Sequence, residues 1–271
     1  INGGTFQLGN GGATGQLTAP SNVINNATYA VNRSNLLIQG DASVITGSGN
    51  FLKRGGGTFR MLGTNSYTGG TVIEDGTIEI GNVAAIGATS GSLTINGGSL
   101  DLANFNIAIG NLTGTGGMIT SSVAGSRTLT LGSGDTGGGT YQGVIADGLG
   151  TTSLVKTGNG TITLTGNNTY TGTTTINGGT LRIGNGGTSG SIAGASGVIN
   201  NAAIVFDSSD DVTLDYAISG SGSLTQDGTG LLVLTEASTY SGGTVVNGGT
   251  LRVQNTTGSA TGSGTVVINN G

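Results

Sequence analysis

The chain has 271 residues and a formal net charge of −5, with 58 glycines, one proline, and neither cysteine nor histidine. Without histidine or cysteine, this segment cannot hold a Ser-His-Asp or Cys-His catalytic site, or a transition-metal site of the usual type. Eight Lys and Arg residues are too few to follow a phosphate backbone, and no run of apolar residues is long enough to span a bilayer. We therefore expect no nucleic acid partner and no direct insertion into a membrane.

In chain order, one motif recurs three times. A tyrosine, small polar residues and a Gly-Thr pair occupy 66–82, 169–185 and 239–255, and residues 1–10 match the second half of the motif. Spacings of 72, 103 and 70 residues separate the equivalent positions Ile1, Ile73, Ile176 and Val246. A near-constant period with one enlarged unit is typical of a stacked, quasi-one-dimensional array.

The period predicts one continuous segment, 1–271, without separate domains. A second register built on Val-Ile-Asn-Asn has the same enlarged middle unit, which supports the period. Approximate unit boundaries are 21–90, 91–195 (the enlarged unit) and 196–262, with partial units at 1–20 and 263–271.

Short apolar runs with a period of two lie between the glycine-rich turns. They are rich in Leu, Ile and Val, they end at Gly, Asn, Asp or Ser, and examples occur at 129–131, 162–164, 181–183, 232–234 and 251–253. Such runs predict strands, and glycine at this density costs a helix about 1 kcal/mol per residue. The chain is therefore predicted to be all-β.

A right-handed parallel β-helix, or β-solenoid, fits this alternation best. Coils of roughly 22–24 residues would give roughly a dozen coils, with Asn side chains bonding along the axis at the corners. A flat or sandwiched Greek-key arrangement fits less well, because the chain has no tryptophan to anchor such a core. We expect Ile24, Ile95, Ile199 and Ile268 to stack in one inward column, or within one coil of it.

Residues 167–185 closely resemble the autotransporter-associated β-strand repeat, also called the passenger-associated transport repeat. Residues 154–166 resemble its usual lead-in, and 108–117 resemble the same lead-in at the start of the enlarged unit. The third copy departs from the pattern, with Gln226 where the others have lysine. The resemblance implies a type V secretion passenger of a Gram-negative-type bacterium, exported through the outer membrane to the cell surface. It also implies that the repeats assist export, each folded coil templating the next.

Four carboxylates form the most charged stretch of the chain: Asp207, Asp210, Asp211 and Asp215. A solvated corner is the favoured interpretation. The alternatives are a Ca²⁺ site, since oxygen ligands suit calcium, and a glycan-processing site with paired carboxylates. No other cofactor is expected.

Tyr67, Tyr170 and Tyr240 occupy one repeat position. They would form an aromatic ladder for a glycan if exposed, or close a corner over apolar residues if buried; the second is favoured. Lys53 and Lys156 also share a position, and we expect them to be exposed strand residues.

The favoured function is a non-enzymatic structural or adhesive passenger segment, whose partner is a host surface, an abiotic surface or a glycan. One alternative is a glycan-binding or glycan-processing β-helix that uses Asp207–Asp215, and another is a self-polymerising fibre. Because the chain begins and ends inside a repeat, we expect it to continue into further coils or to pair with itself through strand edges or coil ends.

Overall fold

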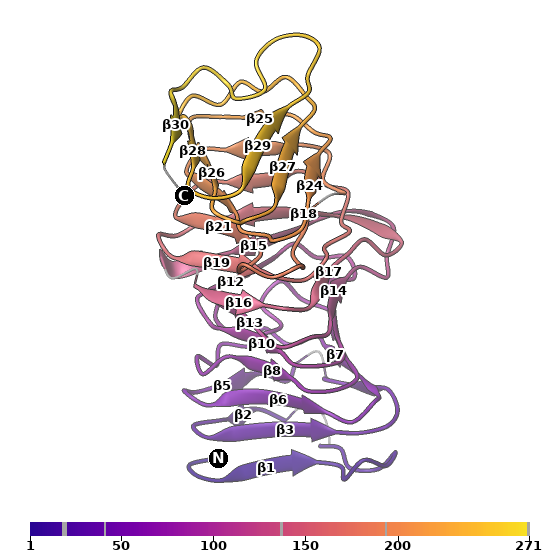
Figure 1. Ribbon diagram of the computed structural model, residues 1–271. Coiled ribbons are helices and arrows are strands. Elements are labelled where there is room, and N and C mark those ends of the chain that lie inside the picture. Colours follow the sequence, from indigo (N-terminus) through magenta and orange to yellow (C-terminus); the bar gives the residue numbers. More distant parts are fainter. Residues whose placement is uncertain (18–20, 41, 136–137, 193, 270–271) are drawn as a thin grey trace.

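A computed structural model describes residues 1–17, 21–40, 42–135, 138–192 and 194–269. The chain forms a parallel β-solenoid of about 12 turns, rising from the N-terminal to the C-terminal end (Figure 1). All strand pairings in the described residues are parallel, and their only helical element is the 3₁₀ turn η1 (Ser133–Asp135). No helix in these ranges is long and apolar enough to span a membrane. The predicted all-β, parallel solenoid of roughly a dozen coils is confirmed.

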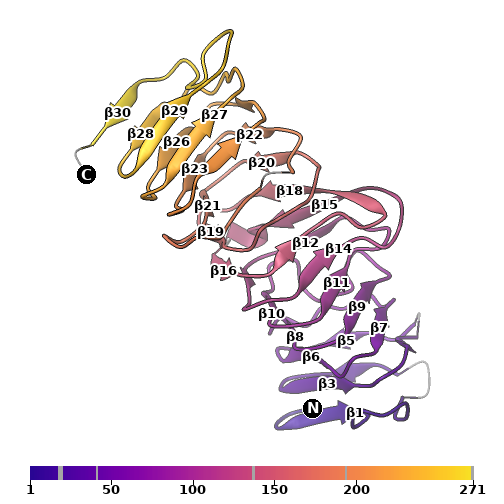
Figure 2. The ribbon, with the colours of Figure 1, turned by 45° about the vertical axis from the view of Figure 1, so that its right-hand side comes forward.

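Two long sheets run up the N-terminal half of the rod, drawn in indigo to magenta in Figure 2. The first contains β1 (Thr5–Leu8), β3 (Thr28–Asn32), β6 (Asn50–Arg54), β8 (Thr71–Ile73), β10 (Leu93–Ile95) and β13 (Leu112–Thr113). The second contains β4 (Leu37–Ile38), β7 (Thr58–Met61), β9 (Thr77–Ile80), β11 (Ser99–Asp101), β14 (Met118–Thr120) and β17 (Val144–Ile145). A small sheet adds β2 (Val23–Ile24) and β5 (Ile45–Thr46).

Three further sheets continue the stack to the C-terminal end. One contains β12 (Ile107–Ile109), β15 (Gly125–Leu131), β18 (Gly150–Lys156), β20 (Thr174–Ile176), β22 (Val198–Asn200) and β25 (Ile218–Ser219). The next contains β16 (Gly139–Tyr141), β19 (Thr161–Leu164), β21 (Thr180–Ile183), β23 (Ala203–Phe206), β26 (Ser223–Gln226), β28 (Thr244–Val246) and β30 (Val266–Ile268). The last contains β24 (Val212–Leu214), β27 (Leu231–Leu234) and β29 (Thr250–Val253).

The core is a stack of inward side chains along the axis. In β18, Leu154 points inward, and it pairs in register with Leu129 of the preceding coil and Thr174 of the following coil. All three are fully buried. Each buried leucine of such a column contributes about 1.5–3 kcal/mol relative to an exposed one, so stability is distributed evenly along the rod.

The expected isoleucine column is wrong for three of its four members. Ile95 is fully buried, but Ile24 and Ile199 point outward and are 65% and 41% exposed. Their neighbours Asn25 and Asn200 point inward instead and are fully buried. Since side chains alternate along a strand, an inward asparagine forces the preceding isoleucine to the outer face.

Ile268 is exposed for another reason. It pairs in register with Val246, which is buried, but it lies on the last described strand and is 75% exposed.

The corners depend on glycine and asparagine. Gly179 has a φ of +62°, and a Cβ there would lie 2.3 Å from the Gly160 carbonyl oxygen, so no larger residue fits. Asn side chains bond from coil to coil as predicted: the Asn201 amide donates to Asn177 over 3.1 Å, and Asn269 donates to Asn247 over 2.6 Å.

Candidate functional site: the repeated corner

Each copy of the recurring motif, taken together with the two strands that precede it, folds into two stacked coils. In the second copy, β18 and β19 belong to one coil, β20 and β21 belong to the next, and the pairs β18–β20 and β19–β21 join the two coils. The first copy repeats this arrangement with β6, β7, β8 and β9, and the third with β26, β27, β28 and β29. The motif is therefore a block two coils high.

A buried lysine closes the corner after the first strand of a block. Lys156 is fully buried, and its ammonium donates to the carbonyls of Thr157 (2.5 Å), Gly158 (3.0 Å) and Gly178 (3.1 Å). Gly178 belongs to the next coil, so this side chain links two coils. Desolvation by burial lowers the pKa of Lys156.

Lys53 makes the same arrangement in the first block. It is fully buried and donates to the carbonyls of Arg54 (2.9 Å), Gly55 (2.5 Å) and Asp75 (3.2 Å), the last on the next coil. Burial lowers its pKa to about 8, and the nearby Asp75 charge partly opposes this shift. The expectation that Lys53 and Lys156 are exposed is wrong, because both follow an inward Phe or Leu at a spacing of two and so point inward as well.

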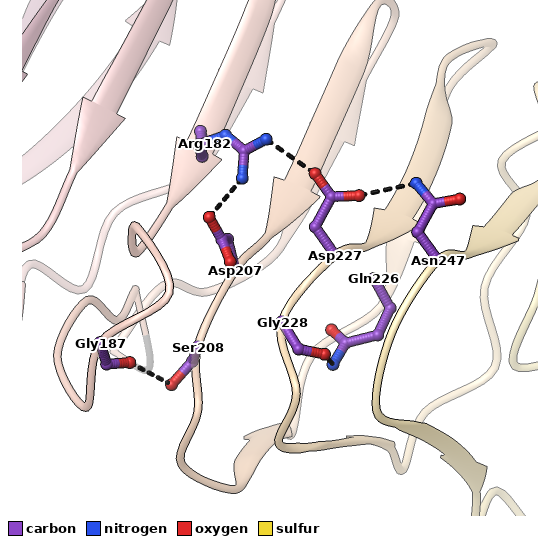
Figure 3. A network of polar contacts seen from close by, with 8 residues as sticks. All are labelled: Arg182, Gly187, Asp207, Ser208, Gln226, Asp227, Gly228 and Asn247. Atoms are coloured by element: carbon purple, nitrogen blue, oxygen red, sulfur yellow. Dashed lines mark hydrogen bonds and ion pairs between the residues drawn. The ribbon is translucent and has the colours of Figure 1, made fainter. Parts of the chain in front are cut away.

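The third block has glutamine at this position. Gln226 is buried, and its amide donates to the carbonyls of Gly228 and Gly230, each over 3.1 Å, as Figure 3 shows for Gly228. Both acceptors lie in the corner that follows Gln226 itself. Among the described residues, no side-chain bond from Gln226 reaches the corner of the next coil, so glutamine at this position keeps the corner filled but does not link the two coils.

Burying cations against carbonyl oxygens is common in this molecule. Four of its eight basic residues are buried, and none of the four forms an ion pair in the described residues: Arg33, Lys53, Arg127 and Lys156. Their acceptors are backbone carbonyls and Asn side chains at the corners. Such charge-assisted bonds are roughly twice as strong as neutral ones, which suits corners whose carbonyls have no strand partner.

The repeated tyrosines lie inside the coils. Tyr67, Tyr170 and Tyr240 are fully buried, and each hydroxyl bonds to a buried threonine four residues on, over 2.6, 2.7 and 2.6 Å. Burial raises the pKa of all three. The three rings do not reach solvent, so they do not form the exposed aromatic ladder considered for a glycan. They are instead buried at the corners of the coils.

The acidic stretch is spread along the surface. Asp207 pairs with Arg182 (2.5 Å), Arg182 also pairs with Asp227 (2.7 Å), and Asp227 accepts from Asn247 (2.7 Å), giving the row of side chains in Figure 3. This row crosses successive coils from β21 to β28. It stabilises the stack from outside, as the lysines do from inside.

Asp210, Asp211 and Asp215 are exposed, and the Asp211 carboxylate accepts the Leu231 amide over 3.3 Å. In the ranges that the structure describes, no three acidic side chains converge so that they could hold a metal ion. The ligand set considered for calcium at Asp207, Asp210, Asp211 and Asp215 is therefore not assembled.

Comparisons with known proteins identify the same repeated blocks. The passenger-associated-transport-repeat family matches residues 51–80, 154–183 and 224–253, which are the three two-coil blocks. The chain is 38% identical over 267 residues to a protein named adhesin BmaC autotransporter from Brucella suis biovar 1 (strain 1330), covering 84% of this chain and 8% of that protein. It is 30% identical over 153 residues to the probable autotransporter YfaL of Escherichia coli (strain K12), covering 52% of this chain and 12% of that protein. The chain thus spans about a tenth of the relatives' length, and no solved structure matches it.

Proposed function

This chain belongs to the autotransporter passenger domains that carry passenger-associated transport repeats, and we propose that it acts as a non-enzymatic, adhesive rod outside the cell. The observation that carries the proposal is the 38% identity, over most of the chain, to a protein named as an adhesin. Its partner would be a surface met after export through the outer membrane.

The architecture supports a presenting role. About a dozen coils at about 4.8 Å each make a rod on the order of 55 Å long, which holds a contact site away from its attachment point. The buried lysines of the first two blocks bond forward to the next coil, so in these blocks one folded coil holds donors that fix its neighbour. Stepwise stacking of this kind would favour export in one direction.

An adherence assay tests the proposal. The chain is displayed on a non-adherent bacterial host, and bacteria bound to fixed epithelial monolayers are counted against the same host displaying an unrelated β-solenoid of equal length. We expect several-fold more bound cells with this chain. Equal counts would refute the adhesive role, and a polysaccharide-cleaving activity lost in Asp211→Asn would favour the glycan-processing alternative instead.

A further inference from the structure

The enlarged middle unit carries a projection that the regular blocks lack. We name residues 121–127 and 146–152 the flange. It includes the first residues of β15 and β18, each seven residues long and the longest strands described, which reach beyond their neighbours in both views (Figures 1 and 2). At this end β15 and β18 pair only with each other in the part of the chain that the structure describes, because β12 and β20 pair with the last three residues of β15 and β18, respectively.

The interior of the flange is polar and is built around a buried arginine. Arg127 is 8% exposed, and its guanidinium donates to the carbonyls of Ala103 (2.8 Å) and Ser126 (2.8 Å) and to the Asn104 side chain (2.6 Å). The buried Ser121 hydroxyl donates to the same Ala103 carbonyl over 2.9 Å. A satisfied polar network fixes one arrangement more narrowly than apolar packing does, although it adds less stability.

The backbone beneath the flange is strained. Ala103 has a φ of +46°, and among the described non-glycine residues only Asp135 shares a positive φ. The Asp101 carboxylate accepts the Ala103 and Ser122 amides over 2.8 and 2.9 Å, and so holds this conformation. A left-handed non-glycine residue costs about 1–3 kcal/mol and persists where the surroundings enforce it, commonly at functional sites.

The rigid flange ends in exposed apolar side chains. Leu149 is 77% exposed, more than any other large apolar side chain described, and Val123 on the adjacent coil is 40% exposed. The Leu149 amide donates to the Ser121 carbonyl over 2.9 Å, which holds the two coils together at the tip. A leucine held in water in this position contributes no hydrophobic stabilisation. A partner that buries it would gain that stabilisation, and little further conformational entropy would be lost on binding.

We propose that the flange tip is an adhesive contact, with Leu149 as the anchor that enters an apolar pocket of a protein partner. This inference rests on the proposed function and names its site. Apart from the buried Arg127, the flange contains no basic side chain for anionic lipid headgroups, and it contains no aromatic ring for sugars. Its one acidic residue, Asp147, is half-buried and accepts hydrogen bonds from the Thr152 amide (2.6 Å) and the Thr171 amide (3.1 Å). A projecting tip whose most exposed side chain is apolar fits a concave apolar protein surface.

The test uses the whole chain displayed as above, with fixed epithelial monolayers as the probe. The double variant Leu149→Ser/Val123→Ser removes the apolar tip. Val83→Ser is the matched control, because Val83 is 62% exposed and lies outside the flange. Circular dichroism and thermal melting of the purified variants establish that each is folded. We expect about a tenfold loss of bound cells for the double variant and none for the control.

Protease treatment of the monolayer separates partner classes, and we expect it to lower wild-type binding to the level of the double variant. A folded double variant that binds like wild type would overturn the assignment of the flange. Binding that survives protease treatment would overturn the choice of a protein partner. A wild-type chain that confers no adherence at all refutes the adhesive function itself, so the two failures are distinguishable.

Discussion

Replacing Lys156 by methionine should loosen the link between two coils without emptying the core. Methionine keeps most of the buried stem and removes the ammonium, so the carbonyls of Thr157, Gly158 and Gly178 each lose a donor. Three bonds from a charged donor contribute about 1.5–3 kcal/mol each, while desolvating the ammonium costs several kcal/mol, so we expect a net loss of about 3 kcal/mol.

Hydrogen exchange measures this loss where it occurs. In a solenoid each coil contacts only its neighbours, so the effect should be confined to the coils that carry 154–158 and 174–180. A loss of about 3 kcal/mol raises the local opening equilibrium roughly 150-fold. Amides in these two stretches should therefore exchange roughly 150-fold faster, and amides around Lys53 should not change.

Lys156→Gln is the graded comparison. The third block shows that glutamine can fill this corner with two bonds to its own coil, so the exchange rates should lie between those of wild type and Lys156→Met. The reasoning fails if Lys156→Met exchanges like wild type, or if the glutamine variant is as fast as the methionine variant.

Three further predictions concern the same corners. Gln226→Lys should slow exchange in 224–228 and 244–250, because an ammonium there could reach the Gly248 carbonyl as Lys156 reaches Gly178. Tyr170→Phe should lower the free energy of unfolding, measured by urea titration, by about 1 kcal/mol, because the hydrogen bond to Thr174 is lost. Tyr141→Phe should leave the free energy of unfolding unchanged, because no described residue bonds to the buried Tyr141 hydroxyl. Stability should rise from about pH 8 towards pH 10, because folded Lys53, with its pKa lowered to about 8, releases a proton that the unfolded chain keeps up to the ordinary lysine pKa of 10.5. Stability should fall above about pH 10, because burial raises the pKa of Tyr67 and Tyr170 and keeps them protonated while unfolded tyrosines ionise. Urea midpoints at pH 7, 9.5 and 11 test this order, and a monotonic trend would contradict it.

The repeat made the fold predictable, because three copies in step fix where strands and corners recur. Alternation in Leu129-Thr130-Leu131 and Ile162-Thr163-Leu164 gave both the strands and their inward faces. These runs contain one polar and two apolar positions, so only one face can be buried.

Short runs with apolar residues on both faces did not fix the register. In Val198-Ile199-Asn200 the buried positions are Val198 and Asn200. The Asn200 amide donates to the Ser223 carbonyl, and its oxygen accepts the Ala202 amide. Asn25 makes the same two contacts with Asn50 and Ala27. Hydrophobicity alone assigns Ile199 to the core, and only the bonds across the corner reverse that choice.

The sequence located the repeated lysine and tyrosine positions, but it did not predict the burial and hydrogen-bond partners of the lysines. Lys156 stands two residues after the inward Leu154, so the alternation already placed it inside, but an isolated lysine is assumed to be solvated until acceptors are seen around it. Those acceptors come from Gly178, 22 residues on, and no local pattern reveals them. The flange likewise depends on Arg127 meeting Ala103 and Asn104, 24 and 23 residues earlier.

Competition by the purified chain tests the central claim most directly, that this rod adheres through a saturable contact. Soluble wild-type chain is added in increasing amounts to epithelial monolayers before bacteria displaying the same chain. The account predicts dose-dependent inhibition that reaches the background of the non-adherent host, with Leu149→Ser/Val123→Ser chain at least tenfold less effective. Adherence that persists at saturating concentrations of folded soluble chain would contradict it.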